Sequence, residues 1–247
     1  MVGEDGMMNR TLLAALCALA ATATATASAP VDAATRNFAI TSFDRVRIDG
    51  PYKVHLATGI APFASATGSA QALDGLAIDV QGRTLVVHVN RSAWGGFSSQ
   101  SPGPVTISLG THDLAAAWLN GSGSLAIDRV SGLGFDLSVQ GSGLVSIDQV
   151  SVDQFRIGLG GAASARLAGT ALRLNATIRG GSSLDAAALQ MKDITVSAEG
   201  PAIVKGAVSG TAKVDAFGVA AVTLTGSPAC IVKTQGSSTV EGCREAR

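Results

Sequence analysis

Residues 121–140 read GSGSLAIDRVSGLGFDLSVQ, and residues 141–160 read GSGLVSIDQVSVDQFRIGLG. Laid over each other without a gap, the two segments match at many positions, and Phe135 falls on Phe155. Self-similarity at a fixed period is typical of repeat architectures, in which each unit packs mainly on its neighbours. This stretch therefore predicts a stack of similar units.

Glycine marks later units at nearly the same spacing, so the repeat continues towards the end of the chain. Successive glycines of this series are 18 to 20 residues apart. Glycine at such positions indicates corners, where a positive φ or a close approach of two backbone segments leaves no room for a Cβ. The predicted structural corner glycines are Gly121, Gly141, Gly161, Gly180, Gly200, Gly218 and Gly236.

Within each unit, apolar residues alternate with small or polar ones, as at Phe135, Leu137 and Val139. A period of two residues is typical of β-strands. Two short strands per unit fit either a meander of hairpins or one coil of a β-helix. Residue identity favours the coil, because only the coil places Phe135 over Phe155 in a shared interior. The sequence predicts an all-β fold, a parallel β-helix (solenoid) with 18–20 residues per coil.

The first segment of the chain has the pattern of a secretory signal peptide, predicted to be removed. Arg10 precedes an apolar run over residues 12–21, and small residues follow as far as residue 29. This order of charge, apolar run and small residues is typical of such leaders. We assign residues 1–29 to it, with the cleavage position open, and expect an extracytoplasmic protein that is periplasmic, surface-exposed or secreted.

The remaining chain is predicted to form a single domain over residues 36–243, followed by a charged tail over residues 244–247. The domain divides by regularity into two parts. Residues 36–110 form an irregular opening half, and residues 119–242 carry the regular repeats.

The opening half shows strand-like alternation without the tight repeat. Strands are expected over residues 76–80 and 85–89, with a turn between them, and residues 90–104 are expected to form a long surface loop. Residues 111–118 are the only helix-like segment outside the leader. We expect this half to be the less regular end of the same stack.

Two of the three cysteines remain after the leader is removed, because Cys17 lies inside it. Export places Cys230 and Cys243 in a compartment that permits oxidation, so we predict that they form one disulfide near the C-terminus. Two unpaired thiols are the alternative.

Charge and composition exclude some classes of function. The chain has 18 basic and 18 acidic residues and no run of like charge, so the basic surface of a nucleic-acid binder is missing. Outside the leader, no apolar run predicts a transmembrane segment. Asp136 and Arg156 share one outward register a coil apart, which predicts an exposed ion pair of little energetic weight.

Titratable groups suited to catalysis are few. The only histidines, His55, His88 and His112, lie far apart in sequence and are expected on the surface. The spacings typical of metalloproteases, nucleophile elbows and phosphate loops do not occur. We therefore predict no catalytic, cofactor-binding or metal-binding residues and no cofactor.

A strand at residues 43–48 (FDRVRI), then Gly50, then the strand around His55, and Gly-Ser-Gly corners further on, together resemble the head GIN domain family of auto-transporter adhesins. The resemblance covers residues 40–242. It implies a right-handed β-helix-type fold in the bacterial envelope, and it supplies no catalytic residues. The implied role is a non-enzymatic adhesin or envelope binding module whose partner is an unknown surface glycan or envelope protein.

Two other functions remain open from the sequence. Asp128 and Asp148 stack in register, and an acidic ladder on a β-helix can serve a polysaccharide lyase or hydrolase. The chain can also be a structural periplasmic protein whose open ends bind other strands.

Overall fold

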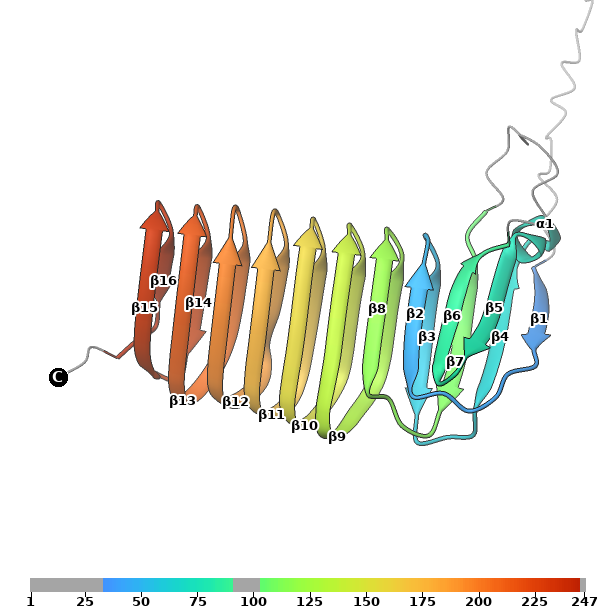
Figure 1. The fold of residues 1–247 in the computed structure, drawn as a ribbon, viewed down its shortest axis with the longest axis horizontal. Helices are drawn as coiled ribbons and strands as arrows, with labels where there is room; N and C mark the ends of the chain where they lie inside the picture. Colours follow the sequence, from blue (N-terminus) through green and yellow to red (C-terminus); the bar gives the residue numbers. More distant parts are fainter. Residues whose placement is uncertain (1–32, 91–102, 245–247) are drawn as a thin grey trace, which may run out of the picture. The chain divides into compact units, whose positions relative to one another are not determined.

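The repeat at residues 121–160 folds as two successive coils in the computed structural model, which describes residues 33–90 and 103–244. Strand β9 (Ser124–Gly141) pairs in parallel with β10 (Leu144–Gly161), and Phe135 is in register with Phe155. The prediction of stacked parallel coils is confirmed, and Figure 1 shows the stack as a β-solenoid.

Later coils continue the same pairing towards the C-terminus. They are β11 (Ser164–Arg179), β12 (Ser183–Glu199), β13 (Ile203–Gly218), β14 (Ala221–Thr225), β15 (Ala229–Gly236) and β16 (Thr239–Glu241). Each of β11 to β13 pairs in parallel along most of its length with the strand before it. The first half of β13 pairs with β14 and the second half with β15, because the chain turns between them.

The described residues between 45 and 121 form seven short strands and one helix whose positions in the stack do not follow the sequence. They are β2 (Arg45–Asp49), β3 (Lys53–Thr58), β4 (Phe63–Gly68), α1 (Ala70–Asp74), β5 (Leu76–Gln81), β6 (Thr84–Val89), β7 (Thr106–Thr111) and β8 (Ala116–Gly121). They follow an edge strand, β1 (Ala34–Phe38), which pairs antiparallel with β4.

The solenoid has two main walls. The first wall consists of β1, β4, β7, β3, the first halves of β9 to β13, β14 and β16. The second wall consists of β5, β6, β2, β8, the second halves of β9 to β13, and β15. Each long strand bends between the walls, so one coil contributes to both.

The coil formed by β2 and β3 is inserted between parts of the chain that come later. In the second wall β2 lies between β6 and β8, and in the first wall β3 lies between β7 and β9. The chain therefore crosses from β7 to β8 past this inserted coil through residues 112–115. The expectation that the opening half belongs to the same stack holds, but the order of its coils was not foreseen.

The prediction of a helix-like segment over residues 111–118 is wrong. Residues 112–115 form a crossing without helix or strand, and β8 begins at Ala116. Ala117 and Leu119 are fully buried while Trp118 is half-buried between them, which is the alternation of a strand. The alanine-rich composition of this segment obscured the two-residue alternation in the sequence.

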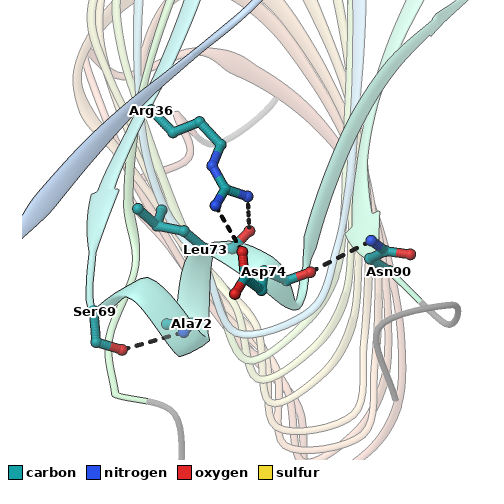
Figure 2. Close-up of polar contacts among 6 residues, drawn as sticks. All are labelled: Arg36, Ser69, Ala72, Leu73, Asp74 and Asn90. Atoms are coloured by element: carbon teal, nitrogen blue, oxygen red, sulfur yellow. Dashed lines mark hydrogen bonds and ion pairs between the residues drawn. The ribbon is translucent and has the colours of Figure 1, made fainter. Parts of the chain in front are cut away.

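Helix α1 lies at the end of the stack far from the C-terminus (Figure 1). Figure 2 shows the polar contacts that hold it: the Ser69 hydroxyl accepts a hydrogen bond of 3.1 Å from the Ala72 N–H, and Arg36 Nη1 donates to the Leu73 carbonyl over 2.9 Å. Arg36 Nη2 also contacts the Asp74 carboxylate at 2.6 Å. Leu73 is buried in the core, so the helix closes this end of the interior.

The interior is a narrow apolar column of Val, Ile, Leu and Ala with few rings. Among the described residues, Thr111 and Ser182 are the buried polar ones, and both make hydrogen bonds. The Thr111 hydroxyl donates to the Phe43 carbonyl, which ties the end of β7 to the segment before β2.

The other end of the solenoid is closed by a covalent link. The Sγ atoms of Cys230 on β15 and Cys243 after β16 are bonded, with their Cα atoms 5.6 Å apart. Val232, which follows the inward register of Val214, is still 41% exposed. The last coil therefore keeps an exposed edge, and it is held by the pairing of β15 with β13 and of β16 with β14 as well as by the disulfide.

Candidate binding surface

The histidines lie apart in space as well as in sequence. His55 is exposed on β3 in the first wall, and His88 is on β6 in the second wall, 3.1 Å from the Asp79 carboxylate. His112 lies in the crossing between β7 and β8. Across residues 33–90 and 103–244, no group of three or more His, Cys, Asp or Glu side chains is placed to hold a metal ion.

The acidic ladder considered for catalysis has a structural use at its first member. The Asp128 carboxylate accepts hydrogen bonds from the Thr58 N–H at 3.0 Å and from the Arg129 N–H at 2.5 Å. Asp148 lies one coil further along at the equivalent exposed position. Asp128 therefore fixes a bend of its coil and ties it to β3.

The corner glycines form a column along the solenoid. Gly121, Gly141 and Gly161 all have positive φ, and so do the other four glycines of the predicted series. A Cβ at Gly141 would lie 2.6 Å from the Gly121 carbonyl oxygen. The backbone of one corner thus rests directly on the corner before it.

The outer side of the second wall is hollowed where β6, β2 and β8 meet. Register places Arg47 of β2 between Val86 of β6 and Trp118 of β8, with all three side chains on the outer side. Asp49 is likewise in register with Asn120. Strands that are distant in sequence therefore bring an arginine, an indole, a carboxylate and an amide onto one patch.

Two adjoining hollows open on this patch, with volumes of about 460 Å³ and 600 Å³. Arg47, Gln81 and Val86 line both of them. The smaller hollow is completed by Thr84, Trp118 and Asn120. The larger one is completed by Asp49, His88, Val89 and Asn90. We call the two together the Trp118 hollow.

Asp49 organises the polar side chains of the Trp118 hollow. Its carboxylate accepts a hydrogen bond of 2.6 Å from the Asn120 amide and lies 3.0 Å from Arg47 Nε. Asp49 is only 31% exposed, so these contacts are partly shielded from water. They orient the Arg47 guanidinium and the Asn120 amide before any ligand arrives. Within the part of the chain that the structure describes, the terminal nitrogens of Arg47 have no partner.

Further along the second wall, outward charges pair between coils. The predicted pair is present, with Arg156 3.4 Å from Asp136, and Arg179 lies 3.5 Å from Glu199. All four side chains are more than half exposed, so each pair contributes little stability.

A third hollow, of about 320 Å³, lies where the crossing passes the start of β2. Arg83 lies 2.7 Å from the Asp44 carboxylate there, and His112 and Asp113 also line the hollow. The Asp44 backbone also bonds to Arg83 and Ala115. These contacts hold the crossing to the stack, which gives this hollow a structural role.

Sequence reasoning did not single out Trp118, Arg47 or Asn120 as a site. The sequence carried part of the signal for this site, because Trp118 is a large aromatic at an outward position of a strand. The strand itself, β8, was predicted as part of a helix-like segment. The pairing of β2 with β8 joins residues about seventy positions apart, and no local pattern marks it.

The stacked parallel coils define the chain as a β-solenoid protein. The match of the chain to a family model identifies its family. The chain belongs to the family described as "Putative auto-transporter adhesin, head GIN domain", whose model matches residues 42–228. The resemblance seen in the sequence is thereby confirmed. No match to a curated protein was found.

Several solved structures share this fold. A putative adhesin from Bacteroides fragilis has a TM-score of 0.78 at 16% identity, over 84% of this chain and 95% of that one. A putative lipid binding protein from Parabacteroides distasonis has a TM-score of 0.68 at 19% identity, over 86% and 97%. A putative adhesin from Parabacteroides merdae has a TM-score of 0.61 at 18% identity, over 86% and 96%.

The described residues contain no helix that is long and apolar enough to cross a membrane. The predicted signal peptide, most of the loop expected over residues 90–104 and most of the charged tail lie outside the described residues.

Proposed function

We propose that this chain is a non-enzymatic binding module of the bacterial envelope, acting in the manner of an adhesin. The observation that carries the proposal is the Trp118 hollow, an oriented set of polar groups beside an indole on the outside of a rigid stack. Membership of a family described as adhesins supports the same role.

The rigidity of the solenoid suits a binding module. Parallel pairing runs through the central coils with local register shifts, and the coils are anchored by fully buried residues such as Phe155 and Leu174. A ligand that meets the second wall therefore finds side chains already held in place, which lowers the entropy cost of association.

An extracytoplasmic location belongs to the same proposal. The predicted leader over residues 1–29 supports export. The disulfide between Cys230 and Cys243 fits an oxidising compartment, since such bonds are rare in reducing ones.

The alternative of a polysaccharide lyase or hydrolase is less well supported. Its first carboxylate, Asp128, already accepts hydrogen bonds from Thr58 and Arg129, and it lies on a bend outside the three hollows. If the enzyme reading is correct, acidic polysaccharides are cleaved by the purified protein and Asp128→Asn abolishes cleavage.

The proposal is tested by measuring binding of the fluorescently labelled, purified protein to intact bacterial cells and to epithelial cells. We expect saturable binding to at least one surface that unlabelled protein displaces. Absence of displaceable binding to every surface, in protein whose circular dichroism shows a folded β structure, would contradict the proposal.

A further inference from the structure

We propose that the Trp118 hollow is a saccharide-binding site, in which a pyranose ring lies against the Trp118 indole and its hydroxyls bond to Arg47 and Asn120. This inference rests on the proposed function and names the chemical class of the ligand.

The surroundings of Trp118 leave room for a flat ring. In the register of the second wall, Trp118 is followed by Ser138 in the next coil and by Gly158 in the coil after it. A Cβ added at Gly158 would meet nothing within 4 Å, so the surface on the side of the indole away from Arg47 is low and open. A half-exposed indole beside such a shelf offers an apolar face to the C–H side of a sugar ring, and it loses little side-chain entropy on contact.

The polar groups beside the indole match the hydroxyl side of a sugar. Arg47 presents terminal nitrogens in a planar fork, and Asn120 presents an amide with one acceptor oxygen and donor hydrogens. Planar groups of this kind can bond to two neighbouring hydroxyls at once. Because Asp49 holds both side chains, the hydroxyls meet donors that are already oriented.

The size of the hollow fits more than one sugar ring. The part beside Trp118 measures about 460 Å³ and adjoins the part of about 600 Å³ near His88. Both volumes lie within the range of roughly 300–1,000 Å³ that small-molecule sites occupy. The second part can receive the next ring of an oligosaccharide, with the Asp79 and His88 pair at its border.

Other ligands fit this surface less well. A nucleic acid needs a basic stripe, and Arg47 is here offset by Asp49. A lipid tail needs a continuous apolar groove, whereas Gln81, Thr84 and Asn120 line this one. A peptide segment remains as a competing outcome of the test.

The experiment measures binding of the purified full-length protein to immobilised neutral and acidic oligosaccharides. We expect the wild type to bind at least one of them, and Trp118→Ala to bind it roughly tenfold more weakly, because an aromatic contact is worth about one order of magnitude in affinity. Asn120→Ala should also weaken binding. Phe217→Ala removes an exposed aromatic at the far end of the stack and should bind like the wild type.

A second readout follows the indole directly. The chain has two tryptophans, so Trp94→Phe leaves Trp118 as the only one. Its fluorescence should change as the bound oligosaccharide is added and should not change with an oligosaccharide that the array rejects.

Three results overturn the inference. In the first, the wild type binds cells saturably but binds no oligosaccharide. In the second, a peptide and not an oligosaccharide displaces the wild type from cells. In both of these cases the proposed function stands without this site. In the third, Trp118→Ala retains oligosaccharide binding in full. If neither cells nor oligosaccharides are bound, the proposed function itself fails.

Discussion

The rings of Phe135 and Phe155 lie one over the other in consecutive coils, with their centroids 5.4 Å apart and their planes 6° from parallel. Both side chains are almost completely buried. The pair is an interior ladder formed by equivalent positions of two repeats. It shows that the coils are in register and that one residue position serves the same purpose in each.

Removing one ring of this ladder should destabilise the fold. We expect Phe155→Ala to lower the free energy of unfolding by about 3–5 kcal/mol, because it leaves a cavity between Phe135 and the coil that follows. Urea unfolding followed by circular dichroism measures the change. Phe217→Ala is the control, since that side chain is 39% exposed and should cost far less. Equal losses in both variants would contradict the ladder.

The stacked corners should tolerate no side chain. Gly141 has a φ of +108°, and a Cβ there would meet the Gly121 carbonyl oxygen, so Gly141→Ala is expected to cost more than about 1 kcal/mol. Gly158→Ala is the matched control, because its Cβ would lie in open space. It should leave the melting temperature unchanged or slightly raised. A neutral Gly141→Ala would show that the corners can move apart.

The disulfide should protect the end of the stack more than its centre. In the double variant Cys230→Ser and Cys243→Ser, we expect the amides of β15 to exchange with deuterium faster, by an amount equivalent to at most about 3 kcal/mol. The amides of β10 should change little, because terminal units of a repeat protein open independently. Unchanged exchange in β15 would mean that the link adds no protection.

Asp193 should titrate at a lower pH than an ordinary aspartate. A hydrogen bond of 2.6 Å from the Thr211 hydroxyl, and a second from the Thr211 N–H, hold the pKa of the Asp193 carboxyl below its ordinary value. Because the pKa is lower in the folded state than in the unfolded one, this contact stabilises the protein above the unfolded pKa, and the gain is lost as the pH falls through the folded pKa.

Thr211→Val removes the hydroxyl and should raise the pKa of Asp193 towards its ordinary value. Nuclear magnetic resonance titration of the carboxyl carbon measures it. Thr195→Val, which changes a neighbouring outward threonine, should leave the pKa of Asp193 where it is in the wild type. A titration of Asp193 that Thr211→Val does not shift would rule out the hydroxyl as the cause.

The regular coils could be predicted from the sequence because local and long-range signals agree there. Strand alternation and the repeat of Phe135 at Phe155 give the same register, and corner glycines mark each turn. The order of the opening coils could not be predicted, because the pairing of β2 with both β6 and β8 depends on contacts between distant segments. Helix α1 was missed because five residues carry too little periodic signal.

The candidate site could not be predicted from the sequence, for the same physical reason. Asp49 and Asn120 are 71 residues apart in sequence and meet only because the β2–β3 coil is inserted beside β8. The disulfide could be predicted, because the compartment and the number of cysteines were enough to suggest it. Sites formed by the order of coils thus require the coordinates, whereas features within a coil do not.

The most direct test of the account compares three proteins in one cell-binding assay: the wild type, Trp118→Ala and Phe217→Ala. We expect wild type and Phe217→Ala to bind the same surface with similar affinity, and Trp118→Ala to bind roughly tenfold more weakly while melting at the same temperature. Wild-type affinity in a folded Trp118→Ala protein would contradict it.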